Sequence, residues 1–144
     1  MIIFVCTGNT CRSPMACALL KNKLKSQGHK IDVKSFGILV VDDSASKGAI
    51  NAMKSIGINI NAHIPALISE DAVSNALLVL TMTNSHKVYI NNTFGENDKV
   101  YTLYEYVHGI NKDVQDPYSG PSSLYLQTAK ELSKLIDELR LPII

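Results

Sequence analysis

The sequence predicts one doubly wound α/β domain over residues 1–144, with a four-stranded parallel sheet flanked by helices on both faces. Segments with the apolar pattern of a strand alternate along the chain with segments that have the periodicity of a helix. The first of these strands is wholly apolar, as expected in the middle of a parallel sheet that is covered on both faces. We find no repeat, low-complexity tract or linker that would divide the chain.

The strands are expected at residues 1–6, 31–36, 76–82 and 99–102. The first helix should follow Ser13 as N-cap and Pro14 as first helical residue, and should end at Gly28. Further helices are expected at residues 45–56, 70–74, 84–91 and 125–139, with a long polar segment between the fourth strand and Gly120. In such a sheet, a ligand site is expected beyond the carboxyl ends of the strands.

Composition excludes several classes of function. The 14 basic and 13 acidic side chains give a net charge of +1, which is too small an excess for a protein that binds nucleic acid through its phosphates. The longest apolar stretch, residues 76–80, is much shorter than the roughly 20 residues that span a bilayer. We therefore expect a soluble, cytoplasmic protein with neither nucleic acid nor membrane as a partner.

The three cysteines, Cys6, Cys11 and Cys17, lie within the first 17 residues. Their odd number and close spacing do not suit a framework of disulfides, and their spacing differs from the short loops of zinc sites. The pattern indicates thiol chemistry and no metal. For Cys17, which lies on the expected first helix, we favour a packing role.

The segment from Cys6 to Ser13 connects a buried strand to a helix N-terminus. Gly8 and Asn9 tolerate the left-handed backbone angles with which successive amide groups form a concave anion site. Helix and guanidinium charge are expected to lower the pKa of the Cys6 thiol from about 8.5 into the range of roughly 3.5 to 7.5. A thiolate facing a bound phosphate is a nucleophile, whereas the alternative reading of Cys6 is a small buried apolar residue at a strand end.

Arg12 and Ser13 follow in the same segment. The planar guanidinium of Arg12 can hold two phosphoryl oxygens over the anion site. Ser13 is an ordinary N-cap, a hydroxyl that donates to the Cys6 thiolate, or both. These residue types at this spacing favour phosphoryl transfer through a covalent cysteine intermediate.

That reaction needs a proton for the leaving atom and a base for the incoming water. Asp116 is the candidate because Pro117 stiffens the backbone after it and Tyr118 can form a wall beside a substrate. The alternative for Asp116 is a surface turn, since an Asp-Pro pair followed by glycine is common there. Asp113 is expected to be only a solvated acidic residue.

Residues 5–14, with the sequence Val-Cys-Thr-Gly-Asn-Thr-Cys-Arg-Ser-Pro, and the later Asp116-Pro117-Tyr118 resemble the low-molecular-weight protein tyrosine phosphatase family over nearly the whole chain. The resemblance implies that Cys6 is the nucleophile, Arg12 the phosphate clamp, and Ser13 the thiolate partner. It assigns Asp116 as acid and then base, with no metal or organic cofactor. It further implies phosphate contacts from Thr7, Gly8, Asn9, Thr10 and Cys11, and bracing of this loop by Asn9, Ser35 and His63.

Thr10 stands where family members that act on phosphotyrosine usually carry isoleucine or leucine, and it resembles the branch of bacterial protein arginine phosphatases. A short polar side chain supports a phenyl ring less well and suits a polar phosphoguanidinium, although Thr10 can also merely fill the loop. The aromatic residue that often lines the family's pocket has no counterpart in residues 38–41, where Leu39 would form a thinner wall.

In the same family, the neighbouring cysteine can trap an oxidised nucleophile as a reversible disulfide, which for this chain would join Cys6 and Cys11. The alternative for Cys11 is a second buried cysteine packed against the sheet.

We therefore expect a monomeric phosphoprotein phosphatase that favours phosphoarginine over phosphotyrosine. An arsenate reductase would need further cysteines, and none follows Cys17. A phosphopeptide-binding module would use neither the thiol of Cys6 nor the acid of Asp116. In a sulfurtransferase, the segment Asp116-Pro117-Tyr118 would have no assigned function.

Overall fold

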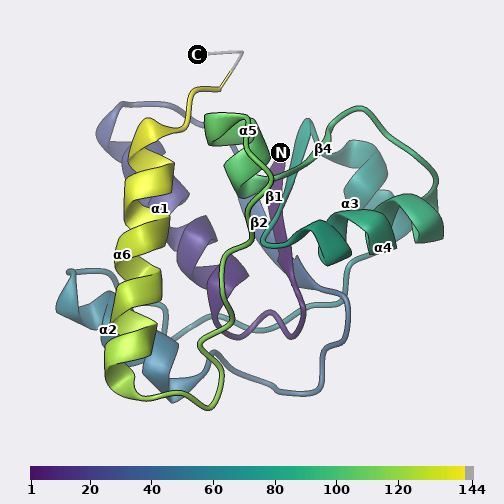
Figure 1. Cartoon of the computed structure of the whole chain (residues 1–144). Coiled ribbons are helices and arrows are strands. Elements are labelled where there is room, and N and C mark those ends of the chain that lie inside the picture. The colour runs from purple at the N-terminus through teal and green to yellow at the C-terminus, as the bar shows by residue number, and fades with distance from the viewer. Residues whose placement is uncertain (142–144) are drawn as a thin grey trace.

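The computed structural model describes residues 1–141 and has at its centre a four-stranded parallel sheet with the order β2-β1-β3-β4 (Figure 1). The strands are β1 (Ile2–Cys6), β2 (Val33–Gly37), β3 (Leu78–Thr81) and β4 (Val100–Thr102). The predicted fold class is confirmed, and every strand begins and ends within two residues of its predicted position. Residues 142–144 of the predicted domain lie outside the described part of the chain.

Helices cover both faces of the sheet because β1 is apolar on both sides. Ile2 and Phe4 point into a core shared with α1 (Arg12–Ser26), α2 (Lys47–Ser55) and α6 (Ser122–Glu138). Ile3 and Val5 point into the opposite core, which α3 (Glu70–Asn75) and α4 (Asn84–Phe94) close. Figure 1 shows these two groups of helices on opposite sides of the strands. Among the described helices, none has both the length and the apolar character that crossing a membrane requires.

The strand order places a crevice at the end of β1. The chain leaves β1 for β2 on one side and later returns to pair β3 on the other side, so that the connections diverge at the carboxyl end of β1. Such a switch point is where ligands bind in open α/β sheets. Cys6 is the last residue of β1, and residues 7–11, the β1–α1 loop, follow it.

The first helix lacks its predicted cap, and one short helix was not predicted. α1 begins at Arg12, with Cys11 at the N-cap position and no side-chain cap, so the predicted capping by Ser13 is wrong. The reason is that the Ser13 hydroxyl bonds within the β1–α1 loop instead. The segment predicted as polar contains the short helix α5 (Leu103–His108), whose start is stabilised by a capping box between Thr102 and Glu105.

The end of β2 packs against the backbone of the β1–α1 loop. A Cβ atom added to Gly37 would lie 2.6 Å from the carbonyl oxygen of Thr7 and 3.0 Å from the amide nitrogen of Asn9. By contrast, a Cβ atom added to Gly8 would meet nothing closer than 3.7 Å, and Gly8 does not adopt the left-handed backbone expected of it. Thus Gly37, rather than Gly8, is the glycine that the loop requires.

We predict that Gly37→Ala lowers the free energy of unfolding by about 1 to 3 kcal/mol, because loop and strand must separate to admit the methyl group. Gly8→Ala is the matched control and should change this free energy by less than about 1 kcal/mol, since its methyl group has room. Urea unfolding of the two variants beside the wild type measures the difference. Equal losses in both variants would contradict this account of the loop.

Candidate active site

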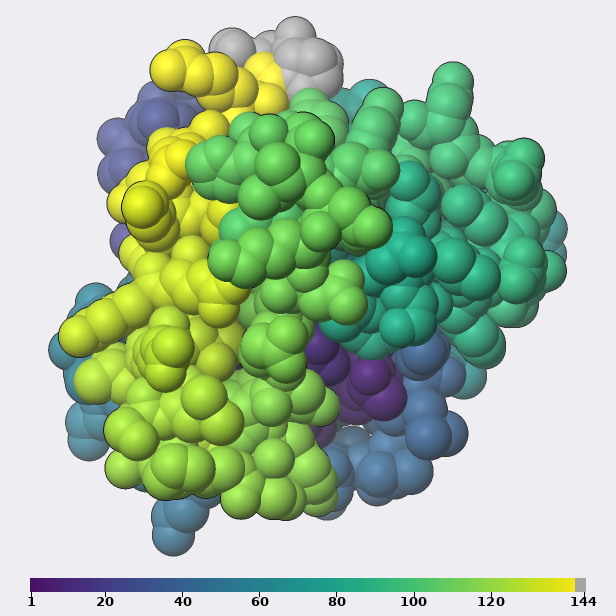
Figure 2. All heavy atoms as spheres, in the orientation of Figure 1, coloured from purple at the N-terminus to yellow at the C-terminus, as the bar shows by residue number. Residues whose placement is uncertain are grey.

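A pocket of about 220 Å³ opens at the carboxyl end of β1. In Figure 2, purple atoms of the N-terminal segment are visible in a hollow bordered by green and blue segments. The lining comes from the β1–α1 loop, from the segment after β2 and from the segment before α6. Its residues are Cys6, Thr7, Gly8, Thr10, Cys11, Arg12, Leu39, Val41, Asp42, Asp116 and Tyr118. The fold therefore brings Asp116 to the thiol and guanidinium from which the sequence separates it by about a hundred residues.

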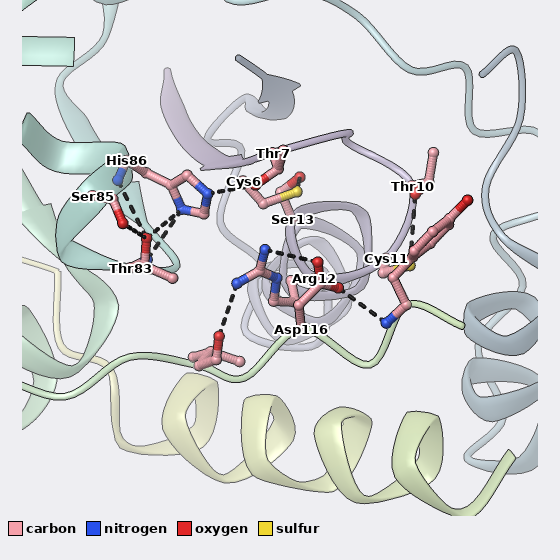
Figure 3. A network of polar contacts seen from close by, with 12 residues as sticks. Cys6, Thr7, Thr10, Cys11, Arg12, Ser13, Thr83, Ser85, His86 and Asp116 are labelled. Carbon is pink, nitrogen blue, oxygen red and sulfur yellow. Dashed lines mark hydrogen bonds and ion pairs between the residues drawn. The ribbon is translucent and has the colours of Figure 1, made fainter. Parts of the chain in front are cut away.

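Hydrogen bonds fix the position of the Cys6 sulfur. Its Sγ lies 2.8 Å from Ser13 Oγ, and both residues are drawn in Figure 3. Ser13 Oγ also accepts a hydrogen bond of 2.7 Å from Asn9 Nδ2. The Asn9 amide donates to Ser13 Oγ, and the hydroxyl proton has two acceptors within reach, the Cys6 sulfur and the carbonyl oxygen of Phe36 at 3.4 Å. When Cys6 is ionised, its sulfur is the nearer acceptor. The geometry places Ser13 as a donor that stabilises a negative charge on Cys6.

The environment of Cys6 exerts opposing effects on its pKa. Burial raises the pKa of the thiol above its ordinary value, whereas the Ser13 hydroxyl, nearby amide groups and the Arg12 guanidinium act to lower it. Burial has the larger effect, so the lowered pKa predicted from sequence is wrong for this structure. The sequence could not show this, because a position at the start of a loop does not reveal that the Cys6 side chain is only 3% exposed.

Asn9 holds the β1–α1 loop in its conformation. It is fully buried and has a left-handed backbone with φ of 57°. Its Oδ1 accepts a hydrogen bond of 3.0 Å from the amide of Ala66, and its carbonyl oxygen lies 2.7 Å from His63 Nε2. Asn9 and His63 thus lie where bracing was expected, but Asn9, also expected to contact phosphate, is not among the residues that line the pocket.

Ser35 does not have the bracing position that the family resemblance implied. No hydrogen bond joins it to the β1–α1 loop within residues 1–141. Its hydroxyl instead acts to lower the pKa of the buried Cys17 thiol, against the larger effect of burial. Cys17 also donates to the carbonyl of Val33 at 3.6 Å, which agrees with the packing role predicted for it. Burial raises the pKa of this thiol to about 11, so Cys17 is a neutral thiol.

Arg12 is buried and its guanidinium is held from two sides. Nη1 donates to the carbonyl oxygen of Val114 at 2.9 Å, and Nη2 lies 3.5 Å from Asp116 Oδ2 (Figure 3). The other carboxylate oxygen of Asp116 accepts from the amide of Tyr118 at 3.1 Å. Asp116 is about half exposed at the mouth of the pocket, where solvent weakens the ion pair and the carboxylate can reach a bound molecule.

The rim of the pocket is partly apolar. Leu39 and Tyr118 are more than 60% exposed and both line the pocket, as expected for substrate walls. Sequence analysis missed Val41 and Asp42, which also line the pocket, because no pattern distinguishes them in the segment after β2. Asp42 gives the pocket a second carboxylate besides Asp116.

Thr10 and Cys11 line the pocket wall next to each other. Thr10 Oγ1 lies 3.6 Å from the sulfur of Cys11, and that sulfur lies 3.1 Å from the hydroxyl of Ser46. All three cysteines are free thiols. A disulfide between Cys6 and Cys11 stays a prediction.

His86 is a buried site residue that sequence analysis missed. Its Nε2 lies 2.9 Å from Thr7 Oγ1, and its Nδ1 accepts from the amide of Thr83 at 3.2 Å, so that it closes a capping box at the start of α4 (Figure 3). The only sequence signal is the spacing Thr83-x-x-His86, in which histidine replaces the usual glutamate or glutamine. Asp113, predicted as merely solvated, accepts from the amide of Asn84 at 2.9 Å and also supports this helix start.

Together these groups form a chemically coherent site. A buried sulfur lies at the floor of a loop whose amide groups and following helix favour an anion. A guanidinium lies beside it, and a carboxyl group is placed at the entrance. This arrangement can bind a tetrahedral oxyanion, attack it with the sulfur and exchange a proton with the departing group.

Comparison with known proteins agrees with this geometry. The family model described as low molecular weight phosphotyrosine protein phosphatase matches residues 1–141. The chain therefore belongs to that family, whose members are cysteine-based phosphatases. The resemblance deduced from the sequence is confirmed.

Individual relatives fall into both substrate classes of this family. A protein-arginine-phosphatase of Bacillus subtilis is 44% identical over 140 residues, which cover 96% of this chain and 93% of the relative. A structure of the YwlE arginine phosphatase, a cysteine-to-serine mutant with a phosphorylated active-site serine, has 42% identity and a TM-score of 0.91, covering 95% of this chain and 91% of that one. A low molecular weight protein tyrosine phosphatase from T. tengcongensis has 41% identity and a TM-score of 0.90, covering 95% of both chains.

His86 makes the stability of the protein depend on pH. Burial and the nearby Arg12 lower its pKa to about 4, although Asp113 and Asp116 act to raise it. The unfolded chain takes up a proton near pH 6.5, whereas the folded protein does so only near pH 4. The contribution to stability is therefore present above pH 6.5 and is lost as the pH falls through this window.

We predict that the free energy of unfolding of the wild type falls by about 2 to 3 kcal/mol more between these two pH values than that of His86→Gln. Glutamine cannot titrate, and it can still close a capping box from this position. Urea unfolding across this pH range measures how the free energy of unfolding changes with pH in both proteins. His63 is present in both and contributes equally to the two pH dependences. Identical pH dependences would show that His86 titrates normally in the folded protein.

Proposed function

We propose that this protein removes phosphate from phosphoarginine side chains of proteins through a phosphocysteine intermediate on Cys6. The observation that carries the proposal is one pocket in which the sulfur of Cys6, the guanidinium of Arg12 and the carboxyl group of Asp116 meet. The arginine phosphatases among its relatives support this substrate, as does Thr10 in the pocket wall.

In the first step, the Cys6 sulfur attacks phosphorus and the bond from phosphorus to the guanidino nitrogen breaks. The sulfur attacks as the thiolate, so the thiol gives its proton to water before the attack. Loop amides and Arg12 bind the phosphoryl oxygens as charge develops on them. Asp116, in its acid form, gives a proton to the departing nitrogen and leaves arginine as the product.

In the second step, water attacks the phosphocysteine. Asp116 is now a carboxylate and takes one proton from this water, while the bond between sulfur and phosphorus breaks to give inorganic phosphate. The negative charge returns to Cys6, where the hydroxyl of Ser13 lies at hydrogen-bonding distance and stabilises it.

The pocket wall supports phosphoarginine over phosphotyrosine. Thr10 offers a short polar side chain where a phenyl ring would need apolar support, and the carboxylate of Asp116 can pair with a guanidinium as well as protonate it. The observation that favours phosphotyrosine is the apolar rim of Leu39, Val41 and Tyr118, against which a ring could pack. Substrate preference is therefore the property to measure first.

We further propose that the enzyme acts on phosphorylated proteins, as a monomer and in the cytoplasm. Support for the monomer is that every group assigned a role comes from one chain and lines one pocket. Support for the cytoplasm is the requirement for a reduced Cys6, which a reducing compartment meets.

Asp116→Asn should lower kcat on a phosphoarginine peptide by about 10²- to 10⁴-fold, because asparagine cannot protonate the departing nitrogen. On an aryl phosphate with a good leaving group, the first step needs little protonation and the loss should be much smaller. Asp43→Asn is the control, because Asp43 is an exposed neighbour of the pocket that we assign no role. Steady-state rates on both substrates test the assignment, which equal losses on the two would refute.

Thr10→Ile should raise the ratio of phosphotyrosine to phosphoarginine turnover roughly tenfold, because isoleucine supports a ring and removes a polar contact. Thr10→Val is the matched control that removes the hydroxyl and keeps the size. Parallel assays on two peptides that differ only in the phosphorylated residue give the ratio, with Cys6→Ser as the inactive blank. A wild type that prefers phosphotyrosine would overturn the proposed substrate, and an unchanged ratio in Thr10→Ile would remove Thr10 as its determinant.

A further inference from the structure

One polar contact joins the start of α4 to the pocket. His86 is the third residue of α4, and it is only 4% exposed between this helix and the β1–α1 loop. Its ring reaches Thr7, the first residue after Cys6, across 79 positions of sequence (Figure 3). The capping box uses only Nδ1 of the ring, so it does not account for the contact between Nε2 and Thr7.

The hydrogen bonds determine which ring nitrogen carries the proton. The amide N–H of Thr83 donates to Nδ1, and a nitrogen that accepts from an amide carries no proton of its own. The neutral ring must then hold its proton on Nε2, from which it donates to Thr7 Oγ1 at 2.9 Å. The lowered pKa of His86 keeps the ring neutral at physiological pH.

Thr7 is therefore an acceptor toward His86, and its hydroxyl proton is directed elsewhere. Within the described part of the chain, His86 Nε2 is the one hydrogen-bond partner of this hydroxyl. Thr7 is exposed and lines the pocket beside Cys6. A hydroxyl that accepts on its protein side is oriented to donate on its open side, and the open side is the pocket.

We propose that His86 is a positioning residue that orients the Thr7 hydroxyl as a hydrogen-bond donor to an oxygen of the phosphoryl group in the pocket. The inference rests on the proposed function, because it assigns one more donor to the same phosphoryl group. Thr7 would share with the loop amides and Arg12 the charge that develops during transfer. No atom changes its covalent partner in this role, and His86 itself does not touch the substrate.

A double-mutant cycle tests the proposal. Thr7→Val removes the hydroxyl at nearly constant size. His86→Asn keeps an acceptor close to the Thr83 amide but has no group that extends to Thr7. Each single variant should lower kcat/KM on a phosphoarginine peptide roughly 10- to 100-fold, the effect of one hydrogen bond to a charged group. Because His86 acts through Thr7, the double variant should lose no more than Thr7→Val alone.

Conservative variants separate positioning from simple support of the fold. Thr7→Ser keeps a hydroxyl and should recover most of the kcat/KM that Thr7→Val loses. His86→Gln carries an N–H near the place of Nε2 and should likewise recover most of the loss in His86→Asn. Losses that multiply in the double variant would overturn the proposal, as would an unaffected kcat/KM in His86→Asn. Urea unfolding shows whether each variant is folded under the assay conditions.

Inorganic phosphate provides the readout that is independent of turnover. Its affinity, measured by calorimetry for the same variants, should fall in Thr7→Val and His86→Asn and again show no further loss in the double variant. If the wild type hydrolyses neither a phosphoarginine nor a phosphotyrosine peptide, the proposed function fails. The double-mutant cycle measured by phosphate affinity still decides the role of His86. Additive losses of phosphate affinity would overturn the inference even in an active enzyme.

Discussion

The hydrogen bonds of Asn9 are the interaction on which the site depends. This one buried side chain bonds to Ser13 at the start of α1 and to Ala66 in the segment before α3, while its carbonyl bonds to His63. Its backbone is left-handed, a conformation that these bonds hold in place. With these bonds in place, Ser13 meets the Cys6 sulfur and the loop amides gather around it. The absence of a side chain at Gly37 lets β2 approach the same loop, so the sheet itself supports the site.

The groups around Cys6 stabilise a negative charge on its sulfur, but burial of the sulfur opposes that charge. Burial opposes ionisation of Cys6, and the donors around the sulfur counteract this effect only partly. Arg12 is likewise buried, and its guanidinium contacts the carbonyl of Val114 and the half-exposed carboxylate of Asp116. A bound phosphoryl group would give Arg12 a stronger contact than its solvent-screened ion pair with Asp116. The guanidinium and the loop amides would then both face the three phosphoryl oxygens.

The sequence predicted the fold and most of the site because both depend on local signals. Apolar strands followed by loops predicted the parallel sheet, and the residue types between Cys6 and Ser13 predicted an anion site in the segment that lines the pocket. Prediction failed where the outcome depended on distant neighbours. For Ser13, the sequence predicted both a helix cap and a contact with Cys6, and only the contact with Cys6 is present. His86 and Asp42 lack a local signal of function, since only the fold brings them to the pocket.

The central claim is that the phosphoryl group passes through a covalent bond to Cys6. The most direct test is rapid acid quenching of the enzyme during turnover of a phosphoarginine peptide, followed by intact-mass measurement and peptide mapping. We expect a transient species heavier by one phosphoryl group, with the added mass on the peptide that contains Cys6. Turnover without any such adduct, or an adduct on another residue, would contradict the account.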